Sequence, residues 1–217
     1  MRSDLQIQQD VHAELRWEPS VHAAWIEVLV RDGIVSLLGH VCSYSQKMAA
    51  EHAVQRVAGV RAVAVKLEVR LEATGKRPDD DIAVAAKDAL NWTAFVPKDR
   101  VTLSVLNGTI ILSGDVDWAY QRVAALTAVH YLQGVISVDN QITVKPRVAV
   151  DGIQNDIEAA LARRAHSDAH AISVSVRGSA VILTGTVSRW GDRELAIHAA
   201  WSAPGVYDVV DNLEMAS

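Results

Sequence analysis

The sequence has little of what most enzymes and disulfide-stabilised proteins depend on. The 217 residues include a single cysteine, Cys42, so an internal disulfide is excluded. No phosphate-binding loop, nucleophile elbow or paired-cysteine motif occurs, and the histidines form no triad in the sequence. We therefore expect a protein that is not an enzyme and that uses no cofactor.

Positive charge and long apolar runs are scarce as well. The net charge is −5, from 21 lysines and arginines against 26 acidic residues, and no third of the chain is a basic block. This argues against a nucleic-acid partner, which would require a basic face. No stretch approaches the roughly 18 apolar residues of a membrane-spanning helix, and residues 1–15 lack the apolar core of a signal peptide. We expect no transmembrane segment and a cytoplasmic location, or a periplasmic one if a signal peptide has been removed.

What the chain does contain is one hairpin pattern, written three times. The three segments are VRDGIVSLLGHV at 30–41, VLNGTIILSGDV at 105–116 and VRGSAVILTGTV at 176–187. The turn pairs Asp32-Gly33 and Asn107-Gly108 are typical of type I′ turns, and Gly178-Ser179 fits type II′. These pairs predict a two-residue β-hairpin in each segment.

Two glycines recur in register with the hairpins. The first glycine is Gly39, Gly114 or Gly185, and the second follows 20 residues later, as Gly59, Gly134 or Gly205. This register indicates three copies of one unit, which we place at residues 1–74, 75–147 and 148–217. We expect the first glycine to end the second strand with a bulge or a positive φ, and the second to cap the helix that follows.

Each hairpin is flanked by helix-period patterns. Apolar residues recur four apart before it: Ile7, Val11, Leu15; Ile82, Ala86, Leu90; Ile153, Ile157, Leu161. An alanine-rich stripe follows it, preceded by expected N-caps at Asp117 and Ser188 in two copies. A last strand alternates in period two, as at Val63, Val65 and Leu67. We predict an α+β fold of three tandem α-β-β-α-β domains, each a three-stranded sheet covered on one face by two helices.

This order resembles the BON domain. The resemblance rests on LLGHV, LSGDV and LTGTV after the hairpins, and on AGVRAV, QGVISV and PGVYDV before the last strands. The asparagine typical of the last strand is Asn140 in the second copy, with Val65 and Asp211 in its place elsewhere. The resemblance implies a non-enzymatic bacterial module associated with phospholipid membranes and with osmotic or envelope stress.

Aromatic residues are few, but six of them are tryptophan and one is phenylalanine. Trp17 and Trp92 share one position at the end of the first helix. Aromatic and arginine side chains also gather at the start of the second helix: Trp118, Tyr120, Arg122, Arg189, Trp190 and Arg193. Such residues suit lipid headgroups or a protein partner, and they equally suit contacts between neighbouring copies.

No metal site is expected. His166 and His170 have the i, i+4 spacing that can seat a metal on a helix, but they follow the expected end of that helix, so we predict a solvated loop.

Three functions compete. The first is a binding module that acts on a phospholipid surface or a protein partner, which the tryptophan and arginine clusters favour. The alternative is a self-associating or protein-binding scaffold with no lipid role, which the negative charge favours because anionic bilayers attract basic patches. A small-ligand sensor is the third, since clefts between domains often hold ligands.

Overall fold

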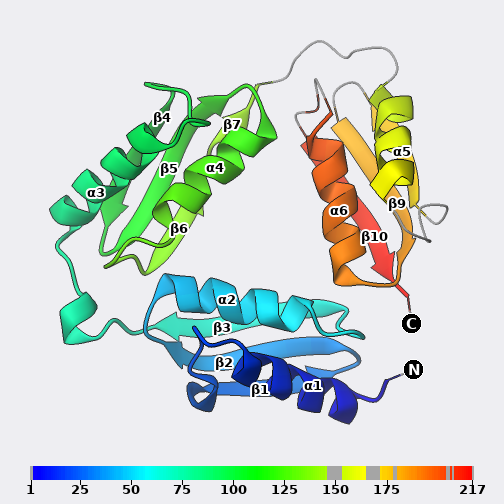
Figure 1. The fold of residues 1–217 in the computed structure, drawn as a ribbon, viewed down its shortest axis with the longest axis horizontal. Helices are drawn as coiled ribbons and strands as arrows, with labels where there is room; N and C mark the ends of the chain where they lie inside the picture. Colours follow the sequence, from blue (N-terminus) through cyan, green and yellow to red (C-terminus); the bar gives the residue numbers. More distant parts are fainter. Residues whose placement is uncertain are drawn as a thin grey trace.

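The computed structural model describes residues 2–145, 153–164, 172–177, 180–203, 206 and 208–216, with the backbone alone for 162–164. Figure 1 shows three separate α+β units, each with two helices packed on a small sheet. The predicted order α-β-β-α-β is confirmed in all three units.

The helices and strands of the units have the following bounds. The first unit contains α1 (Asp4–Trp17), β1 (Ile26–Arg31), β2 (Ile34–Val41), α2 (Tyr44–Gln55) and β3 (Ala62–Val69), with short 3-10 helices at Ala23–Trp25 and Ala73–Gly75. The second contains α3 (Asp79–Trp92), β4 (Val101–Leu106), β5 (Thr109–Val116), α4 (Ala119–Val129), β6 (Ser137–Asn140) and β7 (Thr143–Val144). The third contains α5 (Ile153–Arg164), β8 (Ile172–Arg177), β9 (Ala180–Val187), α6 (Trp190–Trp201) and β10 (Asp208–Met215).

The second strand of each unit lies in the middle of its sheet. It pairs antiparallel with the first strand of the hairpin and parallel with the last strand. In the second unit the last strand is interrupted between Asn140 and Thr143, so β6 and β7 pair separately with β5. The connection from the second strand to the last is made by the second helix, as a parallel pair requires.

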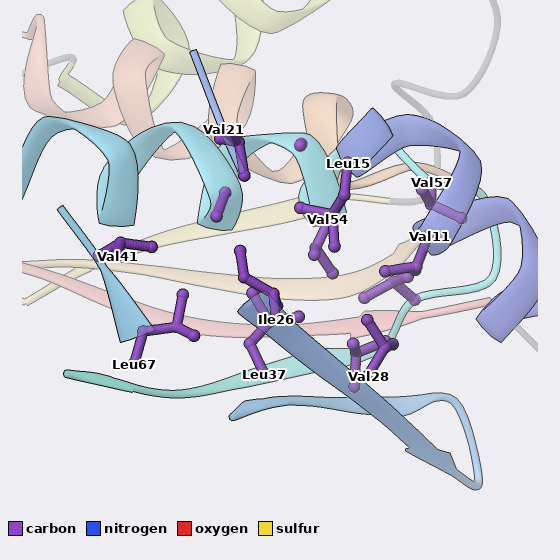
Figure 2. Close-up of a cluster of buried hydrophobic side chains, with 14 of the residues drawn as sticks. Val11, Leu15, Val21, Ile26, Val28, Leu37, Val41, Val54, Val57 and Leu67 are labelled. Carbon is purple, nitrogen blue, oxygen red and sulfur yellow. The ribbon is translucent and has the colours of Figure 1, made fainter. Parts of the chain in front are cut away.

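Each unit has its own hydrophobic core between its helices and its sheet. In the first unit Val11 and Leu15 of α1 and Val54 of α2 meet Val28 and Leu37 of the sheet, and all five side chains are buried (Figure 2). The residues of the four-apart apolar pattern are buried in all three first helices, as expected.

The hairpin turns of the first two units are of the predicted type I′. The φ angles are positive at both turn residues, 52° and 74° at Asp32 and Gly33, and 49° and 74° at Asn107 and Gly108. The third pair, Gly178-Ser179, lies outside the described residues.

The first glycine of each unit has the expected positive φ but does not end its strand. The φ angles of Gly39, Gly114 and Gly185 are +117°, +125° and +128°. The strands continue for two more residues, because the backbone beyond the glycine still pairs with the last strand. A Cβ at Gly114 would collide with the carbonyl oxygen of Arg100, so this close approach requires glycine.

The predicted helix caps need correction. The second glycine does not cap the helix: α2 and α4 end at Gln55 and Val129, and Gly59 and Gly134 lie further along with φ of +95° and +89°. These glycines instead give room to the first helix, since a Cβ at Gly59 would lie 3.2 Å from the Cδ1 atom of Ile7. Gly205 lies outside the described residues.

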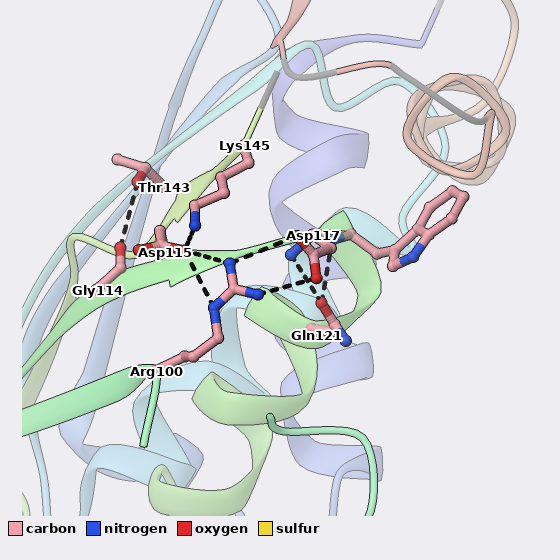
Figure 3. Close-up of polar contacts among 8 residues, drawn as sticks. Arg100, Gly114, Asp115, Asp117, Gln121, Thr143 and Lys145 are labelled. Carbon is pink, nitrogen blue, oxygen red and sulfur yellow. Dashed lines mark hydrogen bonds and ion pairs between the residues drawn. The ribbon is translucent and has the colours of Figure 1, made fainter. Parts of the chain in front are cut away.

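The predicted N-caps Asp117 and Ser188 lie one residue too early. The residues at the N-cap are Trp118 in α4 and Arg189 in α6. In α4 the side-chain oxygen of Gln121 accepts the backbone N–H groups of Asp117 and Trp118, at 3.0 and 3.1 Å. The carboxylate of Asp117 is instead paired with Arg100 (Figure 3).

Candidate functional site

The second helices of the three units lie on their inner sides, toward the space between the units (Figure 1). A cavity occurs at each junction of two units. Its volume is about 590 Å³ between α2 and α4, 740 Å³ between α4 and α6, and 860 Å³ between α6 and the end of α2.

The same face of the second helix is used at two successive junctions. On α4, the cavity with α2 is lined by Val123, Leu126, Thr127, His130 and Tyr131. On α6, the cavity with α4 is lined by the equivalent positions Glu194, Ile197, His198, Trp201 and Ser202. In both cases the second helix of the preceding unit supplies the opposite wall, with residues between Tyr44 and Arg56 in the first cavity and between Trp118 and Val123 in the second.

The third junction lies between the third unit and the first. The start of α6, at Trp190 and Gly191, faces Gln55 and Arg56 at the end of α2. The units are therefore related head to tail, which is the arrangement that forms a closed ring when the rotation allows it. The three cavities are equivalent in position but not in residues, so each can be compared with the other two.

At the first junction, Tyr44 of α2 packs against the core of the second unit. Burial raises the pKa of the Tyr44 hydroxyl, helped by the charge of Glu51 and opposed by a backbone hydrogen bond at Val138. Burial likewise lowers the pKa of His130, with a hydrogen bond to the carbonyl oxygen of Leu126 opposing it and the charge of His52 adding to it. Within the part of the chain that the structure describes, no ion pair joins α2 to α4, and the contact between the two units is made by the aromatic side chain of Tyr44.

The second junction is joined by Arg122 and Trp201. The Cζ atom of Arg122, on α4, lies 4.6 Å from the ring centroid of Trp201, on α6. Trp201 packs against the cores of both the second and the third unit. A guanidinium over an indole ring is a favourable cation–π contact, so this pair holds α4 to α6.

Within the second unit, the side chain that contacts the backbone of Arg122 is the amide of Asn140, on β6. The Nδ2 group of Asn140 donates to the carbonyl oxygen of Arg122 at 3.3 Å, and its Oδ1 atom accepts the N–H of Ile142 at 3.2 Å. Asn140 therefore holds the backbone of Arg122 and carries no charge that would attract its side chain.

The third unit has a carboxylate at that position. Asp211 accepts from the Nε group of Arg193 at 2.6 Å and from the N–H of Leu213 at 3.0 Å. Arg193, the equivalent of Arg122, is thus kept within its own unit, 5.3 Å from the ring of Trp190. Where the second unit has the amide Asn140, its arginine contacts the neighbouring unit. Where the third unit has the acid Asp211, the equivalent arginine forms an ion pair within its own unit.

The six residues that the sequence singled out fall into two groups. Trp118, Tyr120 and Arg122 line the cavity between α4 and α6. Arg189 and Trp190 line the cavity between α6 and α2, and Arg193 lies beside Trp190. The structure brings together the members of each group but places the two groups at different junctions.

A second aromatic feature of the second unit is exposed to solvent and extends to the edge of the cavity between α4 and α6, which Tyr120 also lines. The side chains of Trp92, Phe95 and Tyr120, which we call the aromatic patch, are 89%, 64% and 51% exposed. The rings of Phe95 and Tyr120 meet edge to face, with centroids 5.9 Å apart. Sequence reasoning missed Phe95, although the shared position of Trp17 and Trp92 pointed to this end of the first helix.

The polar cluster at the end of β5 is a structural clamp. Arg100 pairs with Asp115 and with Asp117, the latter at 2.9 Å, and Lys145 lies 2.9 Å from Asp115 (Figure 3). Hydrogen bonds from Lys145 and Arg100 lower the pKa of Asp115. Every charge in this cluster is matched, so it ties β4 to β5 and to the chain after β7.

Neither a metal centre nor a membrane span is found within the described part of the chain. No group of three or more histidine, cysteine or acidic side chains there could hold a metal ion. None of the helices in that part has the length and apolar character needed to cross a bilayer. His166 and His170 lie outside the described residues.

Comparison with known proteins gives one family. The family model described as BON domain matches residues 3–70, 78–146 and 149–217. No curated protein sequence matches the chain. Among solved structures, CdsD, a structural protein of the type III secretion system of Chlamydia trachomatis, is 13% identical over 96% of this chain and 91% of its own, with a TM-score of 0.27. The C-terminal domain of CdsD is 12% identical over 100% of both chains, with a TM-score of 0.26.

Proposed function

Because the chain belongs to the BON domain family, we propose that it is a non-enzymatic binding module that docks on phospholipid surfaces through the aromatic patch. Three domains are joined in one chain, and the second supplies the docking residues. The exposure of the patch is the observation that supports this proposal most directly.

The aromatic patch is exposed although its residues are costly to leave in water. Trp92 is 89% exposed at the last position of α3, and Phe95 is 64% exposed in the loop that follows. The rings of Phe95 and Tyr120 are in contact, and Trp92 precedes Phe95 by three residues in the chain. Exposed aromatic rings that gather in this way mark an interaction site more often than scattered apolar residues do. Tryptophan and tyrosine suit a membrane interface, because the ring enters the apolar layer while the polar group stays near water.

The first unit repeats part of this arrangement. Trp17 ends α1 at the position of Trp92 and is 82% exposed. Two units therefore present a tryptophan at the same end of the first helix. Two weak contacts in one chain bind a surface more strongly than either alone, provided that both can reach it.

A protein-binding scaffold without a lipid role is the second candidate. The net charge of −5 favours it, because an anionic bilayer repels an acidic protein. The same aromatic patch would then serve a protein partner, as tryptophan and tyrosine are enriched at the energetic centres of protein interfaces.

Liposome flotation tests the proposal. We expect the chain to float with vesicles and the double variant Trp92→Ala/Phe95→Ala to lose most of that binding while melting at the same temperature. Leu106→Ala is the matched control, since Leu106 is 64% exposed in the same unit but lies near the hairpin turn, at the opposite end of α3. Zwitterionic and anionic vesicles at low and moderate salt separate apolar insertion from charge attraction. Failure of the wild-type chain to float with either vesicle would favour the protein-binding scaffold.

A further inference from the structure

We propose that the cavity between α4 and α6 binds a small aromatic carboxylate, with Arg122 receiving the carboxylate and the surrounding aromatic side chains packing on its ring. This cavity shares Tyr120 with the aromatic patch, but Arg122 and Trp201, which would recognise the ligand, lie outside that patch, and neither proposal depends on the other.

The cavity has the size and the walls that such a ligand needs. Its volume of about 740 Å³ lies in the range of small-molecule sites. Trp118, Tyr120, Trp201 and Ile197 supply apolar surface from both helices. The ligand would be enclosed by two units, as is common for sites between domains.

Arg122 is the cation of this cavity. It lies on the Trp201 ring, and no described carboxylate forms an ion pair with it. Burial lowers the pKa of Arg122, and the charge of Asp208 opposes that effect. An arginine that lies over an aromatic ring can still donate two parallel hydrogen bonds to a carboxylate through its N–H groups.

The other two units show how unusual this arginine is. Arg193 occupies the equivalent position and is neutralised by Asp211 at 2.6 Å. Arg56 lines both of the other cavities and pairs with Glu14 at 2.7 Å. Arg189 also lines the cavity between α6 and α2, but it is solvent-exposed. Arg122 alone among these combines partial burial with the lack of an acidic partner.

The neighbouring charges favour a ligand with one negative charge. Glu194 lines the same cavity, and the charge of Asp208 reaches Arg122. A phosphate dianion would be repelled by these groups more strongly than a carboxylate. A cationic ligand is disfavoured because Arg122 already covers the face of Trp201 that would attract it.

Isothermal titration calorimetry with 2-naphthoate tests the site. We expect the full chain to bind 2-naphthoate and to bind neutral 2-naphthalenemethanol and dianionic 2-naphthyl phosphate more weakly. Arg122→Gln should weaken 2-naphthoate binding by about 10- to 100-fold, the usual effect of losing hydrogen bonds to a charged group, with little change for 2-naphthalenemethanol.

Asn140→Asp is the sharper variant, because it leaves Arg122 in place. It gives the second unit the carboxylate that Asp211 gives the third, so Arg122 should turn back to its own unit and 2-naphthoate binding should fall to a similar extent. Arg193→Gln is the matched control and should leave binding unchanged. Melting curves of all variants show that they are folded.

Three results would overturn the site. These are no binding of 2-naphthoate at millimolar concentration, equal binding of the acid and the neutral alcohol, or unchanged binding in folded Arg122→Gln and Asn140→Asp chains. The variant Trp92→Ala/Phe95→Ala should still bind 2-naphthoate. Loss of flotation in that variant therefore tests the lipid proposal without affecting this one.

Discussion

The carboxylate of Asp79, the first residue of α3, accepts the backbone N–H of Gly108 at 2.8 Å, although 29 residues separate them. Its other oxygen accepts the N–H of Asn107 at 2.7 Å. Asp4 makes the same pair of bonds to Asp32 and Gly33 in the first unit, at 2.8 and 3.0 Å. An acid at the helix start thus holds the hairpin turn, in addition to its favourable interaction with the helix dipole.

Asp79→Ala should therefore destabilise the second unit by about 1–3 kcal/mol, since two hydrogen bonds to a charged group are lost. The free energy of unfolding in urea measures the effect. Asp80→Ala is the control, because Asp80 shares the first turn of α3 but makes no bond to the turn. Equal losses in the two variants would show that the dipole, rather than the turn, accounts for the effect.

The fold could be predicted from the sequence because its signals are local. The turn pairs Asp32-Gly33 and Asn107-Gly108 specify type I′ hairpins, and apolar residues four apart specify one helix face. The start of α4 was predicted one residue too early because the carboxylate of Asp117 pairs with Arg100, a residue 17 positions away, instead of capping the helix. The local sequence pattern does not contain information about that ion pair.

The arrangement of the units could not be predicted in the same way. Asn140 and Asp211 were recognised as equivalent, but their effect depends on where the neighbouring arginine can reach in space. Arg122 finds Trp201 in the next unit, while Arg193 finds Asp211 in its own. Exposure of Phe95 was equally invisible, since a lone phenylalanine in a sequence is usually a core residue.

Two glycine variants should have opposite effects. Gly114→Ala should destabilise the second unit by about 3 kcal/mol or more, because alanine is strained at φ +125° and its Cβ would collide with the Arg100 carbonyl. Gly191→Ala should stabilise the third unit by up to about 1 kcal/mol, because Gly191 lies within α6 and a Cβ there meets no atom within 4 Å. Thermal melting of both variants checks the signs, and a stable Gly114→Ala chain would contradict the close approach.

The junction between the first two units should weaken in mild acid. Burial lowers the pKa of His130, so the folded chain binds this proton less readily than the unfolded chain does. The stability is then fully present above the unfolded pKa of about 6.5 and declines as the pH falls below it. His130→Gln should reduce the decline in melting temperature between about pH 7 and pH 5. His12→Gln is the control, because His12 lies on α1 and lines none of the three cavities, and it should leave this decline unchanged. If the melting temperature falls equally with pH in both variants, His130 is not the cause of the decline.

Because Trp201 contacts both the second and the third unit, removing its side chain should loosen the arrangement of the three units. Trp201→Ala should cost about 2 kcal/mol or more, from lost packing and the lost cation–π contact with Arg122. Because the lost contacts join two units, the radius of gyration measured by small-angle X-ray scattering should increase as well. Trp17→Ala is the control, since Trp17 is 82% exposed and should change neither quantity. A Trp201→Ala chain that is destabilised but keeps its radius of gyration would contradict this prediction. Trp201 would then stabilise only its own unit, and other contacts, such as that of Tyr44 with the second unit, would hold the three units together.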